Sequence, residues 1–395
     1  MTLADPNPPA PTPQPGGTRD FVFTFSYESF ADAQKRGMMR PPDRLVTTLI
    51  DSPDVRRLLV ADPWRSWLTG WARRVIDFSH RPHETEKLRH VSPLRLARAD
   101  PTDVDAIAET YRQYERVVQR AASAADLQHP LFVTASPLVG GFASLDWAGS
   151  ALYYARDDWL SSPGRRRYWP AYAEAYRRIA RSGRAVAAVS QEIIDRIEPT
   201  GPHRVVPNGI EPREWLGPQP AAPAWFDRIP GPRAAYLGTL DSRLDLEGLH
   251  ALARARPDLH IVLIGPAPDP KYIAGLRGLP NVHIRGEVRR AEVVAVLRNC
   301  ELTLLAHRRT SLTEAMSPLK VYEYLAAGRP VLATDLRPVR NFGDRVHLAE
   351  TVTDFIDLVD VALAQGIEDE PKRQAFITAN AWTTRHKEIL SLISD

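Results

Sequence analysis

The sequence contains a single cysteine, Cys300, among its 395 residues. One thiol cannot form an intrachain disulfide, and the Pro-rich stretch 1–18 has no apolar segment of the kind that a signal peptide needs. We therefore expect a cytoplasmic protein, since disulfides are rare in that compartment. Cys300 closes the apolar run VVAVLRNC, so we expect an inert thiol at a helix end.

Several other features are missing, and each excludes a class of protein. No stretch reaches the roughly 18–20 uninterrupted apolar residues of a membrane span. The net charge of +3 is too small to indicate a nucleic-acid partner. No compact His, Asp and Glu cluster suggests a metal site. No G-x-G-x-x-G follows the first predicted strand, which argues against a nicotinamide-dependent oxidoreductase. We expect no metal and no cofactor.

Short apolar runs alternate with longer helical patterns along most of the chain. The runs are nearly continuous in apolar residues and end at Gly, Pro, Asp or Ser, as in strands buried on both faces of a parallel sheet. The predicted strands are 21–25, 56–62, 88–92, 131–136, 151–156, 185–190, 234–240, 260–266, 282–287, 302–307 and 330–335. Helix-length segments lie between many of them, at 106–125, 168–182, 288–299 and 317–327. This alternation predicts an α/β fold.

One break divides the pattern. After VVPNGI comes PREWLGPQPAAPAWFDRIPGPR, which is dense in Pro and Gly and is typical of a connection between domains. We predict a disordered leader over 1–18, a Rossmann-like domain over 19–206, a second Rossmann-like domain over 213–365 and a closing helix over 371–394. Two doubly wound sheets bind ligands in a crevice at the carboxyl ends of their strands.

The most informative segment is EAMSPLKVYEYLAAGRPVLATD, residues 314–335. Ser317 suits a helix N-cap, Pro318 the first helical position and Gly328 the position after the last turn. The segment therefore predicts a short helix that is followed by a strand.

Two charged residues lie on one face of this helix. Lys320 falls in the first turn, where free backbone N–H groups and the helix dipole favour an anion. Glu323 follows one turn later, and its carboxylate can accept hydrogen bonds from a sugar diol. Spacing alone also fits the alternative of a solvated Lys/Glu pair on a surface helix.

The segment SPLKVYEYLAAGRPVLATD resembles the donor-site signature of bacterial glycosyltransferases of the GT-B fold, in the family-4-like group called glycosyl transferases group 1. The resemblance implies that Lys320 contacts the donor's diphosphate, that Glu323 contacts its ribose, and that Ser317 belongs to the same donor site. Similar matches cover most of the C-terminal half, and the first 130 residues match only loosely. The other matching segments are AVAAVSQEIIDRI, RVVPNGIEP, AAYLGTLDSRLDLEGL, HIVLIGP, NVHIRGEVRRAEVVAVL and NAWTTRHKEIL.

The resemblance also places two residues after the first strand of the second domain. Gly238 lies where the chain passes close to phosphate, and Arg243 matches a basic residue that contacts the diphosphate. An alternative stays open for Arg243, as a surface partner of Asp241 or Asp245. Enzymes of this group generally need no catalytic metal, because basic side chains and helix dipoles neutralise the leaving group.

One departure from the family pattern concerns stereochemistry. Many retaining members carry a second Glu eight residues before the ribose Glu. That position is Ala315 here, and Glu314 lies one residue too early. An inverting reaction is therefore consistent with the sequence.

Inversion requires a base that takes the acceptor hydroxyl proton. Asp157 and Asp158 follow the apolar strand ALYYAR, and YYARDDW resembles a YD-x-x-DDW element of the family. Both are candidate bases, with the alternative that one of them caps the next helix. His307, after LTLLA, is a further candidate on that edge of its sheet, although a lone His is more often structural.

Residues 64–75 place Trp64, Trp67, Leu68, Trp71 and Val75 on one helical stripe, with arginines elsewhere. A basic amphipathic helix with Trp suits contact with an anionic membrane, as a lipid-linked acceptor requires. We favour the alternative that this helix packs on its own sheet.

These observations predict a metal-independent glycosyltransferase. The expected partners are a UDP, dTDP or GDP sugar and a hydroxyl acceptor that is a polysaccharide precursor, a lipid carrier or a secondary metabolite. The alternative is a catalytically silent GT-B module that acts as a scaffold. Loss of nucleotide binding in a thermal-shift screen would favour that alternative.

Overall fold

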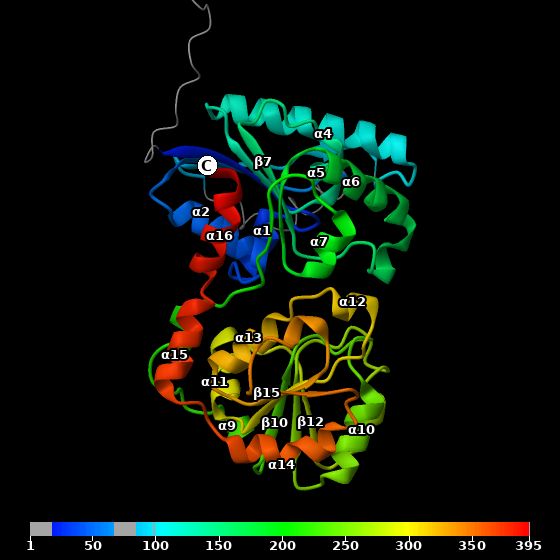
Figure 1. Cartoon of the computed structure of the whole chain (residues 1–395), viewed down its shortest axis with the longest axis vertical. Helices are drawn as coiled ribbons and strands as arrows, with labels where there is room; N and C mark the ends of the chain where they lie inside the picture. Colours follow the sequence, from blue (N-terminus) through cyan, green and yellow to red (C-terminus); the bar gives the residue numbers. More distant parts are fainter. Residues whose placement is uncertain (1–17, 67–83, 98, 395) are drawn as a thin grey trace, which may run out of the picture.

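The computed structural model describes residues 18–66, 84–97 and 99–394. Figure 1 shows two α/β domains, one above the other, with the green-to-orange second domain below the blue-to-green first one. The leader predicted over 1–18 lies outside the described residues except for its last position.

The N-terminal domain is built on a parallel sheet of seven strands in the order β4-β2-β1-β6-β7-β8-β9. The strands are β1 (Arg19–Thr24), β2 (Val55–Ala61), β4 (Leu88–Val91), β6 (Leu131–Thr134), β7 (Ser150–Ala155), β8 (Ala185–Ala188) and β9 (His203–Val205). A separate pair joins β3 (Arg65–Ser66) to β5 (Leu94–Arg95). Because all pairs in the main sheet are parallel, every strand ends at the same edge.

Helices pack on the faces of this sheet. They are α1 (Phe30–Lys35), α2 (Pro41–Asp51), α4 (Val104–Ala124), α5 (Pro137–Phe142), α6 (Trp169–Arg181) and α7 (Gln191–Ile197), with a 3-10 turn η1 (Pro163–Tyr168) before α6. Asp103 caps α4 by accepting from the backbone N–H of Ala106. Helices α5 and α6 lie so close that a Cβ on Gly141 would come within 2.5 Å of the Ala175 Cα.

The C-terminal domain has a parallel six-stranded sheet in the order β12-β11-β10-β13-β14-β15. Its strands are β10 (Arg233–Leu237), β11 (His260–Ile264), β12 (Val282–Arg285), β13 (Leu302–Leu305), β14 (Val331–Thr334) and β15 (Val346–Ala349). Its helices are α8 (Pro212–Trp215), α9 (Ala224–Asp227), α10 (Leu246–Ala255), α11 (Arg290–Asn299), α12 (Ser311–Glu314), α13 (Leu319–Ala326) and α14 (Phe355–Gln365), with 3-10 turns η2 (Ala274–Leu276) and η3 (Arg337–Val339).

Both faces of the second sheet are buried. Alternate residues along each strand enter different apolar clusters: Ala235 and Val262 lie in one, and Ala234 and Ile261 in the other. This explains why the strands read as continuous apolar runs. Every strand that the sequence predicts is present, whereas β9, β15 and the two-residue strands β3 and β5 were not predicted. Strand β9 is mostly polar, and His347 interrupts the short apolar run of β15.

The end of the chain departs from the prediction of one helix over 371–394. The structure has two helices, α15 (Glu370–Ala379) and α16 (Trp382–Ser394). Between them, Ile210 donates to the Asn380 carbonyl at 2.9 Å, and its own carbonyl accepts from Trp382 N at 2.9 Å. A helical period in the sequence does not reveal a break that a distant backbone segment stabilises.

The second of these helices returns to the N-terminal domain, where it is red in Figure 1. Ile389 and Ile393 of α16 belong to the N-terminal core. Thr48 Oγ1 of α2 lies 2.6 Å from His386 Nδ1 of α16. The last helix therefore ties the two domains together.

The amphipathic helix predicted over 64–75 lies, from residue 67 on, outside the described residues. At its start the prediction is wrong, because Arg65 and Ser66 form strand β3 and Trp64 packs against the N-terminal core. In the described parts of the chain, no helix combines the length and apolarity needed to cross a membrane.

Candidate functional site

The end of β10 and the start of α13 meet at one point. Gly238 follows β10 with φ +139°, a backbone conformation that favours glycine. A Cβ at this position would lie 2.7 Å from Lys320 Nζ. The absence of a side chain therefore lets the ammonium group of α13 approach the backbone at the carboxyl edge of the sheet.

The polar groups in direct contact with Lys320 are neutral. Its Nζ donates to the Tyr236 hydroxyl at 3.0 Å, lies 3.2 Å from His307 Nε2, and sits 4.3 Å from the centre of the Tyr236 ring. Burial and the nearby charge of Lys320 hold the pKa of His307 well below its usual value, so this ring is neutral and can accept from the ammonium. Among the described residues, no carboxylate forms an ion pair with Lys320.

The electrostatic consequence is a lysine that would gain from a bound anion. Burial, followed by the charge of Arg243, lowers the pKa of Lys320 to about 7. A diphosphate at this position would oppose both effects, because it supplies negative charge next to the ammonium. The arrangement is preorganised for an anionic ligand.

Glu323 lies one turn further along α13 and is buried, with a relative exposure of 6%. Its Oε1 is 2.6 Å from Arg290 Nη1, at the start of α11. Arg290 also donates to Glu214 Oε2 at 2.8 and 2.6 Å, and Arg44 of α2 donates to the other oxygen of Glu214 at 2.6 Å. A series of ion pairs therefore connects the N-terminal domain to Glu323, the predicted ribose-binding carboxylate.

Sequence reasoning did not single out Arg290. A signal was available, since a cation in the first turn of a helix opposes the helix dipole and needs a compensating partner. The ion pair with Glu323 supplies that partner.

The start of α13 differs by one residue from the prediction. The N-cap is Pro318 rather than Ser317, and the helix begins at Leu319. Ser317 instead accepts from Asn208: its Oγ from the backbone N at 3.2 Å and its carbonyl from Nδ2 at 2.7 Å. The side chain is engaged with the interdomain connection, which spacing within one helix cannot reveal. Gly328, with φ +75°, lies just after the helix as predicted.

Arg243 adopts the arrangement that we considered as the alternative. Its Nε and Nη2 donate to the two oxygens of Asp241 at 2.9 and 2.7 Å. It still lies close to the predicted donor site, because its charge lowers the pKa of both Lys320 and His307.

Ala315 and Glu314, the two residues that bear on the stereochemistry of the reaction, each form a hydrogen bond with another part of the chain. Ala315 is buried, and its carbonyl accepts from Ser190 Oγ, after β8, at 2.9 Å. Glu314 Oε2 accepts from Arg337 N at 2.9 Å. The first contact brings the carboxyl edge of the N-terminal sheet against the loop before α13.

The two candidate bases have different surroundings. Asp158 is buried, and its carboxylate accepts from Ser161 Oγ, from Leu160 N at 3.2 Å and from Arg196 Nη1 at 2.9 Å. The Asp157 side chain is 47% exposed and pairs with Arg156 at 3.0 Å.

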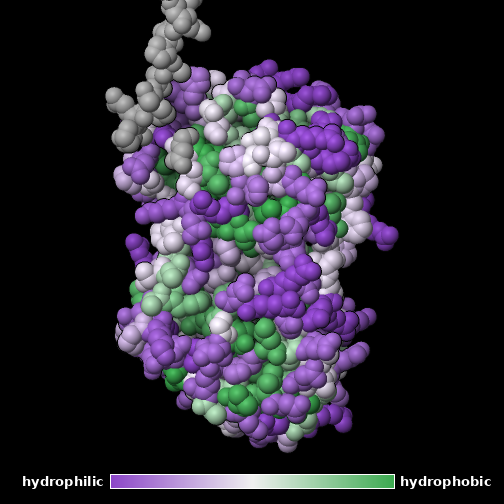
Figure 2. All heavy atoms as spheres, in the orientation of Figure 1, coloured by the Kyte–Doolittle hydropathy of each residue, from purple (hydrophilic) through white to green (hydrophobic). Residues whose placement is uncertain are grey.

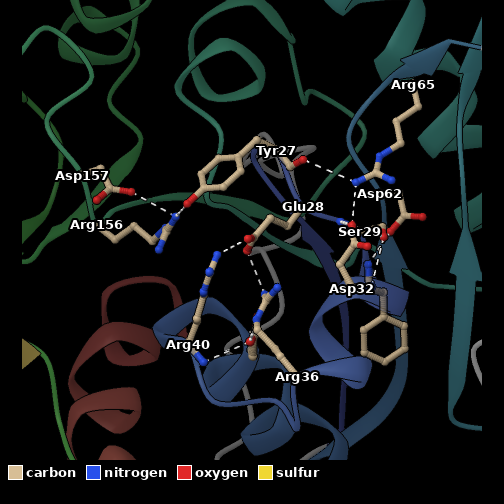
Figure 3. A network of polar contacts seen from close by, with 12 residues as sticks. Tyr27, Glu28, Ser29, Asp32, Arg36, Arg40, Asp62, Arg65, Arg156 and Asp157 are labelled. Atoms are coloured by element: carbon tan, nitrogen blue, oxygen red, sulfur yellow. Dashed lines mark hydrogen bonds and ion pairs between the residues drawn. The ribbon is translucent and has the colours of Figure 1, made fainter. Parts of the chain in front are cut away.

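Asp157 lies within electrostatic range of Arg243 in the other domain. Its charge is among the causes that raise the pKa of Arg243, after the hydrogen bond and charge of Asp241. Arg156 Nη2 also donates to the Tyr27 hydroxyl, after β1, at 2.6 Å, and Figure 3 shows Asp157, Arg156 and Tyr27 in one line of contacts. The sequence did not predict the contact between Arg156 and Tyr27, since the loops after β1 and β7 are distant in the chain.

The described residues contain no group of three or more His, Cys, Asp or Glu that could hold a metal ion. Figure 2 shows hydrophilic side chains, in purple, across much of the middle of the visible face, where the two domains meet.

Comparison with known proteins finds one family model that matches the C-terminal domain. Residues 232–364 match the model of glycosyl transferases group 1. The chain is 26% identical over 165 residues to a putative teichuronic acid biosynthesis glycosyltransferase, TuaH, of Bacillus subtilis (strain 168), a match that covers 39% of this chain and 41% of that protein. The chain thus spans about two fifths of the length of this curated relative.

Solved structures resemble the fold over almost the whole chain. OtsA, in its apo form, matches with a TM-score of 0.66 at 12% identity, covering 96% of this chain and 99% of OtsA. HepE of Anabaena, in complex with UDP and glucose, matches with a TM-score of 0.57 at 14% identity, covering 95% of this chain and 99% of HepE. These likenesses confirm the predicted architecture of two Rossmann-like domains, the GT-B fold.

Proposed function

We propose that this chain is an enzyme that transfers a sugar from a nucleoside diphosphate donor to an acceptor hydroxyl. The match of residues 232–364 to the model of glycosyl transferases group 1 supports this proposal. The observation that carries the proposal is Lys320, an ammonium group without an ion-pair partner among the described residues, held against Gly238 at the start of α13.

The donor diphosphate binds at Lys320, within the field of Arg243. Negative charge grows on the leaving diphosphate as the bond to the sugar breaks, so a preorganised cation there stabilises the transition state more than the bound donor. Glu323 accepts from the ribose hydroxyls through the oxygen that Arg290 does not hold. Positive side chains and the helix terminus supply the neutralisation, and the reaction needs no metal.

The acceptor reacts on the side of the N-terminal domain. Asp157 takes the proton of the acceptor hydroxyl, the hydroxyl oxygen bonds to the anomeric carbon, and the diphosphate leaves with the electron pair of the broken bond. Asp157 suits this role because it is half exposed and its charge acts on Arg243, next to the proposed donor site. Asp158 does not, because three donors already occupy its carboxylate. The anomeric configuration of the transferred sugar is therefore inverted in the product.

Two comparisons narrow the substrates. The HepE complex contains UDP and glucose, which favours a UDP sugar over a dTDP or GDP sugar. The name of the TuaH relative favours a polysaccharide precursor as acceptor over a secondary metabolite. A lipid-linked form of that precursor remains within the proposal.

A thermal-shift panel tests the donor half of the proposal. UDP, dTDP and GDP are each added to the full chain with EDTA present, and UDP should raise the melting temperature most. Lys320→Ala should reduce the shift, whereas Lys271→Ala, at an exposed lysine of the same domain, should keep it. No shift with any nucleotide would support the scaffold alternative, and a shift that requires Mg²⁺ or Mn²⁺ would contradict the metal-free mechanism.

A further inference from the structure

A compact group of arginine and aromatic side chains lies beside Asp157, on the edge of the N-terminal sheet where β1 and β7 end. We call Tyr27, Arg156, Trp159 and Arg165 the arginine–aromatic cluster. Tyr27 and Trp159 meet edge to face with ring centres 5.9 Å apart. The guanidinium carbon of Arg165 lies 5.4 Å from the Tyr27 ring centre and 5.6 Å from the Trp159 ring centre.

A second arginine shares the same ring. The guanidinium carbon of Arg156 lies 5.3 Å from the centre of the Tyr27 ring, and its Nη2 donates to the Tyr27 hydroxyl. Two cations against one aromatic ring repel each other, and the only carboxylate paired with either among the described residues is Asp157, on Arg156. The cluster therefore carries an excess of positive charge.

The cluster also contains buried donors without acceptors. Trp159 is 6% exposed, and its indole Nε1 has no hydrogen-bond partner within the described structure. The same holds for Arg156 Nε. Arg165 forms no ion pair with any carboxylate in the described residues. Buried donors are costly unless an acceptor satisfies them, and an oxyanion provides several acceptor oxygens.

We propose that the arginine–aromatic cluster binds an anionic group of the acceptor, a phosphate or a carboxylate, and so holds the acceptor hydroxyl at Asp157. The planar guanidinium of Arg165 presents paired N–H donors that match either oxyanion, and its stacking on two rings orients them. This inference rests on the proposed function, since it names the class of acceptor for the same reaction.

The arrangement favours an acceptor over a membrane surface as the source of the anion. Arg165 is only partly exposed, and its guanidinium lies over the two rings of the cluster. Arg166 and Arg167 are exposed and lie over Trp169 and Tyr168, outside the cluster. Binding to a lipid surface would depend on all three arginines alike, because it follows total charge near the surface. Binding of one anionic group depends on Arg165 alone, and the two neighbours are matched controls.

The test measures binding by saturation-transfer NMR, with the full chain saturated with UDP. The probes are glucose 6-phosphate, glucuronate and glucose. The anionic probes should bind more tightly than glucose. Arg165→Gln should weaken them about 10- to 100-fold, the loss expected when one charge-assisted hydrogen-bonding partner is removed, and should leave glucose unchanged. Arg165→Lys, which keeps the charge and loses the fork, should fall between.

Controls separate this inference from its alternatives. Arg166→Gln and Arg167→Gln should bind the probes as the wild type does, and all variants should keep the wild-type melting temperature. Equal binding of charged and neutral probes, or equal losses at all three arginines, would overturn the proposal. So would a loss in Arg165→Gln confined to co-sedimentation with phosphatidylglycerol vesicles. The UDP-induced thermal shift, measured in parallel, reports on the donor site, so failure of the proposed function is seen separately.

Discussion

Replacing Lys320 by methionine should stabilise the protein while abolishing its reaction. Methionine has a similar length and volume but no charge, so the packing of α13 against β10 is kept. The ammonium is desolvated without an ion-pair partner among the described residues, which is why its pKa falls from 10.5 to about 7. A group held for function in an unfavourable environment is a recurrent source of such a trade-off.

The magnitude follows from the pKa. A drop of that size costs the folded state about 4 kcal/mol at pH 7, at about 1.4 kcal/mol per unit. Solvent at the partly exposed side chain and the loss of the hydrogen bonds to Tyr236 and His307 reduce the net gain. We expect about 2 kcal/mol, or a rise of about 4–8 °C in the melting temperature for a domain of this size.

The gain should also depend on pH in a defined direction. Between pH 7 and 10.5 the unfolded lysine holds a proton that the folded one has lost, so wild-type stability rises with pH in this window. The advantage of Lys320→Met should therefore shrink as the pH rises from 7 toward 10.5. Urea unfolding at pH 7 and pH 9.5 measures both values.

Turnover provides the second measurement on the same variant. We expect a loss of about 10²–10³-fold in kcat, as for other groups that stabilise charge in the transition state. Lys271→Met, at an exposed position, should change neither stability nor turnover. A less stable Lys320→Met variant would refute the reasoning, because the buried ammonium would then not cost the folded state free energy. Normal turnover would refute it as well, because Lys320 would then take no part in the reaction.

Three further predictions follow from the same geometry. Asp157→Asn should abolish transfer and keep UDP binding, whereas Asp158→Asn should mainly lower the melting temperature; a product of retained anomeric configuration, seen by NMR, would remove the need for a base. Arg290→Gln should weaken UDP binding about 10-fold in calorimetry by releasing Glu323, and unchanged affinity would show that the ion pair only stabilises the fold. UDP binding at pH 8 should take up a proton, because the diphosphate raises the pKa of Lys320 from about 7, so the affinity for UDP should fall as the pH rises above 7. Calorimetry in buffers of different ionisation enthalpy would detect this proton uptake, and binding without proton uptake would contradict this account.

Local sequence patterns determined much of the fold. Strands buried on both faces need apolar residues at nearly every position. Every strand of the two main sheets that is longer than three residues, except β15, was therefore predicted as an apolar run. The helix around Lys320 was predicted within one residue of its start, because Pro and Gly restrict the backbone locally. The position of Lys320 in the first turn followed from the same signals.

Contacts between distant segments were decided by the tertiary structure alone. The break at Asn380 depends on the backbone of Ile210, and Ser317 is held by Asn208 rather than capping its own helix. Neither partner is visible in the local pattern of the segment that it alters. The same reason explains why one helix was predicted where the chain forms two.

The surroundings of the charged residues were also beyond the sequence. The motif YYARDDW gives Asp157 and Asp158 equal standing, and only burial and hydrogen bonding distinguish the exposed carboxylate from the engaged one. The partner of Glu323 and the stacking of Arg165 likewise arise from loops and helices far apart in the chain. A sequence supplies the chemical groups of a site, whereas their pKa values and their unused hydrogen-bond donors and acceptors depend on which groups the fold brings next to them.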